Sequence, residues 1–224
     1  MTEEFDKLAA VLKKRHSCRA FLPDPVERAT IEKLLSAAAY VPSWCNAQPW
    51  QVIITSGEET DRFRVALYET ATTQTAKPDL DWPRQYTGVY QERRKTCGLQ
   101  LYEAVGIERG DRAASAQQML ENFNLFGAPH MALITSEADL GAYGALDCGG
   151  YITAFTLVAQ ALGIATIPQA AVASFAPFLH QWFDIPENRL VIAAISFGYA
   201  DKTHPANSFR TERATLDETV VWRG

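Results

Sequence analysis

Several motifs that mark cofactor or catalytic sites are missing from this chain of 224 residues. No G-x-G-x-x-G motif follows an expected strand, which argues against the usual dinucleotide-binding fold. There is also no G-x-x-x-x-G-K-[ST] loop for nucleotide phosphates and no G-x-S-x-G turn for a nucleophilic serine. The chemistry of this protein therefore has to come from residues outside these motifs.

Cysteine and histidine are scarce, with four residues of each type. They form neither a C-x-x-C pair nor a cysteine–histidine set at metal-ligand spacing, so we expect no metal site, and we expect the thiols to be reduced. These residues are Cys18, Cys45, Cys97, Cys148, His16, His130, His180 and His204.

Excess positive charge and long uninterrupted apolar runs are missing as well. The formal net charge is -5, which argues against nucleic acid or an anionic membrane as a partner. Residues 148–183 contain no Asp, Glu, Lys or Arg, but Gly163 and Pro168 interrupt them. We therefore expect buried elements there rather than a membrane span. The start, "MTEEFDKLAA", has no apolar signal core, so we expect a cytoplasmic protein.

Helical and strand patterns alternate irregularly along the chain. Apolar spacing predicts helices at 3–14, 25–38, 58–73, 113–126, 149–162 and 175–183, and apolar runs predict strands at 50–55, 130–135, 164–168 and 189–200. Helices dominate, which predicts an α+β protein with a small central mixed β-sheet surrounded by helices.

Two of these helices have specific signals at their start. Asp24 is a good N-cap, with Pro25 at the first helical position and Glu27 at the capping-box position. Ser174 is placed to cap the helix that follows it.

We interpret residues 1–224 as a single domain with an insertion at about 75–125 and a C-terminal arm at about 205–224. The insertion is rich in aromatic residues, which suit either a lid over a flat substrate or an extension of the core or of a dimer surface. Its aromatic residues are Trp82, Tyr86, Tyr90, Tyr102, Phe123 and Phe126.

The densest basic cluster is "KKRHSCR", residues 13–19. One interpretation is a solvated helix end, because cations stabilise the C-terminus of a helix. The other is an extended segment in which Arg15, Ser17 and Arg19 share one face while Cys18 and Ala20 pack on the other. Two guanidiniums and a hydroxyl are good donors for a phosphate group.

Five stretches in order resemble the nitroreductase family of FMN-dependent flavoproteins, and most closely its nitrobenzoate-reductase-like branch. They are "RHSCRAF", "PVERATIEKLLSAAAYVPSWCNAQPW", "GIATIPQAAVASF", "LVIAAISFGYA" and "FRTERATLDETVVW". The resemblance implies an intertwined homodimer with FMN bound at the interface. It also implies reduction by NAD(P)H and ping-pong hydride transfer through flavin N5 to a nitroaromatic or quinone-like acceptor.

The same resemblance implies roles for individual residues. The phosphate would be held by Arg15, Ser17, Arg19 and Arg213, with His16 among them and Arg210 as a further candidate. The flavin ring would be approached from the partner chain by Pro42, Ser43, Trp44, Asn46 and Gln48. It would be bordered by Pro168, Gln169, Ala170 and Ala171, with a backbone N–H near Ala171 toward N5. No side chain is required as an acid or base, and Thr211 stands where relatives often have a lysine.

Three other possibilities remain open at this point. The same fold is used for reductive dehalogenation and for flavin cleavage, although residues 80–110 do not match the substrate-gripping signatures of those branches. A non-enzymatic flavin-binding protein is the third. The sequence names neither the physiological acceptor nor the preferred coenzyme, and the terminal "ETVVW" could add a strand to the sheet of a partner chain.

Overall fold

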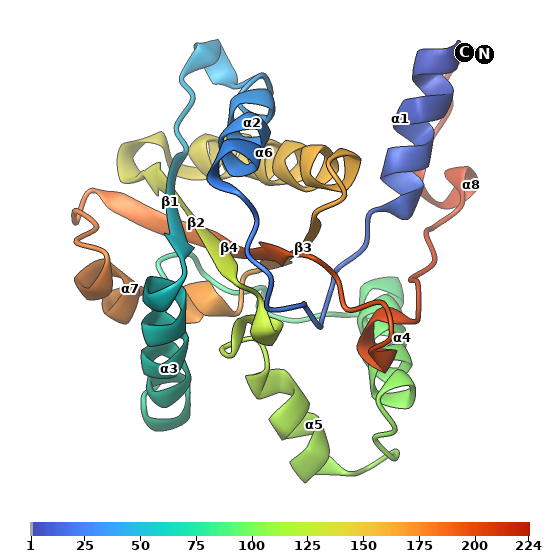
Figure 1. Cartoon of the computed structure of the whole chain (residues 1–224). Coiled ribbons are helices and arrows are strands. Elements are labelled where there is room, and N and C mark those ends of the chain that lie inside the picture. Colours follow the sequence, from blue (N-terminus) through green and yellow to red (C-terminus); the bar gives the residue numbers. More distant parts are fainter. Residues whose placement is uncertain (1) are drawn as a thin grey trace.

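The computed structural model describes residues 2–224 and is built around one sheet of four strands in the order β1-β2-β4-β3 (Figure 1). The strands are β1 (Gln51–Ser56), β2 (His130–Glu137), β3 (Ala165–Gln169) and β4 (Arg189–Gly198). Helices surround this sheet, so the expected α+β class is confirmed.

The expectation of a mixed sheet is wrong, because all three neighbouring pairs of named strands are antiparallel. Among the described residues, parallel pairing is confined to isolated bridges, Ser17 with Thr166 and Lys77 with Phe175. A strand that is apolar on both faces suits either direction, so its residue pattern does not encode how it pairs.

The core lies on both faces of the sheet. On one face α3 (Glu58–Thr73) and α7 (Ala176–Trp182) pack around Leu133 of β2. On the other, α2 (Arg28–Ala38) and α6 (Gly141–Ala161) pack around the next residue, Ile134 (Figure 1). Central strand β4 is buried along most of its length, as its continuous apolar sequence predicted.

Three predicted helix starts are wrong. Residues 24–27 stay extended because the backbone N–H of buried Val26 donates to Nε2 of His130 at 2.8 Å, so α2 begins only after Glu27. Ser174 lies in a 3₁₀ turn, and its hydroxyl donates to the carbonyl of Ala171 instead of capping α7. The central helix α6 begins at Gly141, earlier than the predicted 149.

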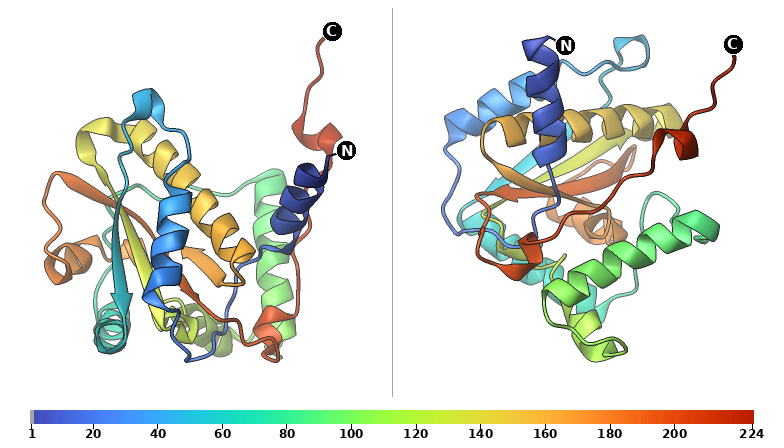
Figure 2. Two further views of the ribbon diagram at one scale, coloured as in Figure 1. Left: turned by 45° about the horizontal axis from the view of Figure 1, so that its top comes forward. Right: turned by 90° about the vertical axis from the view of Figure 1, so that its right-hand side faces the viewer.

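The insertion carries α4 (Gly88–Ala104) and α5 (Arg112–Leu120), which stand away from the sheet (Figure 2). The predicted helix 113–126 ends at Leu120, and Leu125 and Phe126, with φ of 52° and 51°, are excluded from it. Left-handed φ values of this kind cannot continue a right-handed helix.

The arm ends in α8 (Leu216–Thr219) and passes beside α4 (Figure 2). Short 3₁₀ helices complete the chain: η1 (Trp44–Asn46), η2 (Leu125–Gly127), η3 (Ala138–Leu140), η4 (Val172–Ser174) and η5 (Pro205–Asn207). Within residues 2–224, no helix has the length and apolar character needed to cross a bilayer.

Two exposed apolar surfaces, one on the first helix and one along α6, have no cover within the described chain. The first helix, α1 (Glu3–Lys14), buries none of its residues and exposes Phe5, Leu8 and Leu12. A shallow apolar groove runs along α6, lined by residues such as Leu146 and Leu157. Contiguous exposed apolar surface of this kind marks an interaction site.

Candidate functional site: an arginine-lined trough

The basic cluster takes the extended form at the point where α1 ends. Ser17 forms a parallel bridge to Thr166 of β3, and the backbone N–H of Cys18 donates to the Thr166 carbonyl at 3.0 Å. Cys18 is fully buried, whereas Arg15 and Arg19 remain partly exposed. Alternation along this edge of the sheet therefore places Arg15, Ser17 and Arg19 on the outer face, as the extended interpretation predicted.

This face lines a pocket of about 520 Å³ that joins both ends of the chain. Its residues come from the N-terminal segment, from the C-terminal arm and from one position of α4; they are Leu12, Lys13, Arg15, His16, Ser17, Arg19, Cys97, Phe209, Arg210, Thr211 and Arg213. The four arginines that sequence reasoning singled out are thus brought together.

The positive charge in this pocket has no protein counter-charge. Within residues 2–224, none of the four arginines forms an ion pair with a carboxylate. Burial, and then the charge of Arg213, lower the pKa of Arg15; burial also lowers the pKa of Arg19. Burial and the surrounding guanidiniums lower the pKa of His16. A bound anion would relieve this repulsion.

The C-terminal arm is held to the basic segment by Asn207, a residue that no motif marks. Its buried side chain bonds to the backbone of Arg19 and of Ala20, and its own carbonyl accepts from Nη1 of Arg210 at 2.8 Å. The guanidinium of Arg19 also lies 5.7 Å from the ring centroid of Phe209. Arg213 donates only to its own segment, to Oγ1 of Thr211 at 2.7 Å among others.

A second pocket of about 280 Å³ shares Ser17 and Arg19 with the first, so the two form one trough. Its floor is the end of β3 and the turn that follows, Pro168 to Ala171. In the part of the chain that the structure describes, the backbone N–H of Ala171 donates to no protein acceptor. The opposite wall comes from the insertion: Leu101, Tyr102, Gln118, Met119 and Asn122. Apart from Tyr102, these wall residues escaped sequence reasoning, because they share no motif.

The aromatic residues expected as a lid divide into three groups. Trp82, Tyr86 and Tyr90 are exposed and line neither pocket of the trough; the ring of Tyr86 instead lies 5.2 Å from the guanidinium of Arg94. A lid role for Phe123 is wrong, because it is 5% exposed and packs in the core. Phe126 is also buried and forms part of the fixed wall of the second pocket.

The loop 42–48 does not reach the trough of its own chain. Trp44 packs instead on α6, where its backbone N–H donates to Asp147 at 3.0 Å and its ring lies 4.7 Å from that of Tyr143. This loop precedes β1 and lies across the molecule from α4 (Figure 1). Buried Arg189 holds it in place by donating to the carbonyl of Pro49 at 2.9 Å. A contribution from Pro42, Ser43, Trp44, Asn46 and Gln48 to a flavin site stays a prediction.

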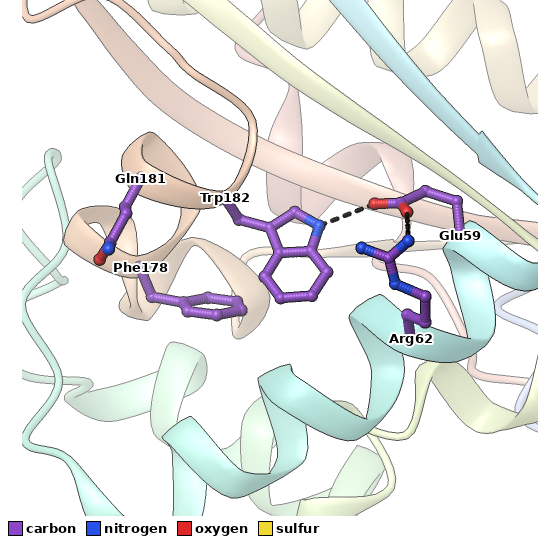
Figure 3. Close-up of a pocket in the computed structure, with 5 residues that line it drawn as sticks. All are labelled: Glu59, Arg62, Phe178, Gln181 and Trp182. Carbon is purple, nitrogen blue, oxygen red and sulfur yellow. Dashed lines mark hydrogen bonds and ion pairs between the residues drawn. The ribbon is translucent and has the colours of Figure 1, made fainter.

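Another pocket, of about 380 Å³, lies between α3 and α7, away from the trough (Figure 3). Its two charged groups pair with each other: Nε1 of Trp182 donates to the Glu59 carboxylate at 2.9 Å, and Arg62 pairs with the same carboxylate at 3.6 Å. Because no charge there lacks a partner, the trough is the better candidate site.

A model described as the nitroreductase family matches residues 12–199. The chain belongs to the nitroreductase family. Among curated proteins it is 36% identical to nitroreductase NfnB of Mycolicibacterium smegmatis, over 94% of this chain and 90% of that protein. It is 30% identical to 4-nitrobenzoate reductase of Pseudomonas putida, over 95% of this chain and 92% of the relative.

Solved structures of nitroreductases have the same fold. The FMN-dependent nitroreductase NfnB from Mycobacterium smegmatis, solved in complex with NADPH, superposes with a TM-score of 0.93 at 34% identity, covering 98% of this chain and all of that one. An FMN- and NADPH-dependent NfnB from Sphingopyxis also gives 0.93 at 29% identity, over 97% of this chain and 99% of the other. The recognition made from sequence is confirmed.

Proposed function

We propose that this nitroreductase-family chain is a cytoplasmic, FMN-dependent oxidoreductase that oxidises NADPH and reduces nitroaromatic acceptors. The observation that carries the proposal is the trough, in which four arginines without carboxylate partners adjoin a pocket floored by small residues. The relatives support it, since one is an FMN-dependent enzyme solved with NADPH and another is a 4-nitrobenzoate reductase.

The residues of the first pocket fit a phosphate monoester. Arg15, Ser17 and Arg19 present their donors on one face, and the arm adds Arg210 and Arg213 from the other side. A phosphate carries nearly two negative charges and pairs well with guanidinium groups. Its binding would offset the burial, and then the repulsion from Arg213, that lower the pKa of Arg15.

The second pocket fits the flat end of the same molecule. The turn after β3 offers the small side chains of Ala170 and Ala171 and an unused backbone N–H at Ala171, a donor for a ring nitrogen. When bound, FMN supplies a ring that takes a hydride from NADPH and gives electrons to the acceptor. The protein's part is to orient the reactants and exclude water, which explains why no acid–base pair is needed.

The working unit we propose is a homodimer. It would cover the apolar surfaces of α1 and α6 and the exposed end of the arm, including Trp222. It would also bring the outward-facing loop 42–48 of one chain to the trough of the other. The loop, which does not reach the trough of its own chain, would then complete the site of the partner chain.

We further propose ping-pong kinetics with quinone-like molecules as additional acceptors. A pocket of about 280 Å³ is small for two planar molecules beside a flavin, so coenzyme and acceptor would use it in turn. Initial-rate plots at several NADPH concentrations should then give parallel lines in double-reciprocal form.

The cofactor and the turnover are tested on the purified protein. The expected result is a yellow protein that releases FMN on denaturation, is bleached by NADPH without oxygen, and regains its colour with 4-nitrobenzoate. A colourless protein that takes up no FMN would overturn the proposal. A flavin that stays oxidised under excess NADPH and NADH would indicate a non-enzymatic flavin-binding protein instead.

A further inference from the structure

The second pocket of the trough has two walls that come from distant parts of the chain. One wall is the turn after β3, and the other is formed by the insertion, through Leu101 and Tyr102 of α4 and Met119 of α5. Neither α4 nor α5 buries a residue of its own. Their position relative to the turn therefore depends on the attachment of the two ends of the insertion and, for α4, on contacts with the C-terminal arm.

The N-terminal end of the insertion is attached to the core by three hydrogen bonds. The backbone N–H of Lys77 donates to the Ser174 carbonyl at 2.7 Å. Asp79 then accepts from the backbone N–H of Val191 at 2.8 Å and from Nε2 of His180 at 2.9 Å. These bonds fix where the chain leaves the core, but they lie before the exposed stretch 81–96.

The C-terminal end is attached by the buried ring of Phe123 and, beside the pocket, by hydrogen bonds from the side chain of Gln169. Gln169 is the last residue of β3 and only 2% exposed. Its Oε1 accepts from the hydroxyl of Ser196 in β4, and its Nε2 donates to the carbonyl of Asn122 at 2.8 Å. The amide thus joins the sheet to the segment that follows α5.

The segment on the far side of this bond is stiff. Leu125 and Phe126 both have left-handed φ values, and both side chains are buried. A displacement at Asn122 is therefore passed back toward Met119 and Gln118 more readily than forward into the core. The Gln169–Asn122 bond sets the spacing between the two walls.

We propose that Gln169 is a positioning residue for the acceptor. Its side chain points into the protein rather than at a ligand, and it acts through Asn122 on the wall of α5. The consequence is control over the width of the slot in which a flat acceptor binds. This inference rests on the proposed function and assigns a specificity role within the same site.

The test compares Gln169→Leu, which has similar size but no hydrogen bonds, with two other variants. Ser196→Ala removes the Oε1 partner alone. Thr60→Val is the matched control, since it removes another buried hydrogen bond, Thr60 to Thr55 at 2.9 Å, away from the trough. Activity is followed with NADPH and 4-nitrobenzoate, FMN affinity by titration of the apoprotein, and stability by thermal melting.

Gln169→Leu should lower kcat/KM for 4-nitrobenzoate by about tenfold or more, because displacements near 1 Å are costly in a reacting geometry. FMN affinity should fall by less than kcat/KM does, since the phosphate pocket keeps its contacts. Ser196→Ala should give a smaller loss in the same direction. Thr60→Val should lower the melting temperature but leave kcat/KM unchanged.

Amide hydrogen exchange gives a readout that does not need activity. Residues 118–124 should exchange faster in Gln169→Leu than in wild type and should be unchanged in Thr60→Val. If residues 118–124 of Gln169→Leu exchanged at the wild-type rate, or if its kcat/KM were unchanged, the positioning role would be wrong. If Gln169→Leu does not fold, Ser196→Ala tests the positioning role by its kcat/KM and by the exchange of residues 118–124. If wild type itself neither binds FMN nor oxidises NADPH, the proposed function is wrong. The exchange data would still show whether Gln169 holds residues 118–124 in place.

Discussion

The side-chain Oδ1 of Asn207 accepts a hydrogen bond from the backbone N–H of Arg19 at 2.7 Å. Its Nδ2 donates to the carbonyls of Ala20 and Asp201 at 2.9 and 2.8 Å. One buried amide therefore sets the position of the arm's arginines relative to those of the N-terminal segment.

Replacing Asn207 by Ala should weaken FMN binding by about tenfold. The substitution leaves the N–H of Arg19 without its acceptor, and an unsatisfied buried group costs about 1–3 kcal/mol. Titration of the apoprotein with FMN measures the effect. Asn188→Ala is the control, because the side chain of that asparagine bonds to Glu137 on the surface, away from the trough. Equal FMN affinity in both variants would contradict the role of Asn207.

The double variant Arg15→Ala/Arg19→Ala should be purified without flavin. Losing two charge-assisted contacts costs about 3 kcal/mol or more, which corresponds to at least about 100-fold in Kd. The apoprotein should keep its fold, because the variant removes like charges that repel one another. Absorbance near the flavin maxima and thermal melting give both results. Arg28→Ala, at an exposed pair with Glu32, should keep its colour; a yellow double variant would show that the phosphate is held elsewhere.

A charge on the uncovered face of α6 should break the proposed dimer. Leu146 is 68% exposed and lines the apolar groove, so Leu146→Asp would place a carboxylate in the interface. We expect a monomer in sedimentation velocity and loss of FMN, because the loop 42–48 of the partner would be absent. Val65→Asp is matched in exposure at 69% but lies on α3, and it should remain dimeric and yellow. A wild-type monomer that binds FMN would contradict the proposed assembly.

The hydrogen bond between His180 and Asp79, which attaches the start of the insertion to the core, should depend on pH. Burial alone would lower the pKa of His180, but its hydrogen bonds to Asp79 and to the carbonyl of Ile185 outweigh this and raise it. A raised pKa in the folded state means that the stabilisation is complete below the unfolded pKa of about 6.5 and is lost as pH rises through the folded value.

The protonated pair should add about 0.5 kcal/mol to the free energy of unfolding, because it is partly exposed and screened by water. Thermal melting of wild type and His180→Gln at pH 6 and pH 8.5 measures it. The variant should be destabilised relative to wild type at pH 6 and less so at pH 8.5. A constant difference between the two proteins would rule out the protonated pair. Both proteins contain His16 and His130, whose lowered pKa values give the opposite pH dependence. Their contribution cancels when the difference between variant and wild type is compared at the two pH values.

Much of the fold was predictable because it depends on neighbours in sequence. The spacing of Phe5, Leu8 and Leu12 predicted α1 with its observed ends, and the apolar run of β4 predicted a central strand. The alternation from Arg15 to Arg19 predicted one polar and one packed face. Each of these features follows from the period of a helix or of a strand.

Other features depended on a contact that local patterns do not contain. α2 begins later than predicted because Val26 bonds to His130. Phe123 is not part of a lid because the chain turns into the core after α5. The direction of the strands likewise followed from long connections rather than from strand composition. A propensity describes what a segment prefers alone, and a distant partner can override it.

The sequence by itself determined which groups could bind an anion: guanidiniums near residue 17 and near residue 211, with small residues at 170 and 171. Only the tertiary structure decided that these groups share one trough, that Asn207 joins its two ends, and that Gln169 faces inward to hold its far wall. The physical reason is that hydrogen bonds and charges act over a few ångströms in space. Residues far apart in the chain can therefore form one site only after the fold has brought them together.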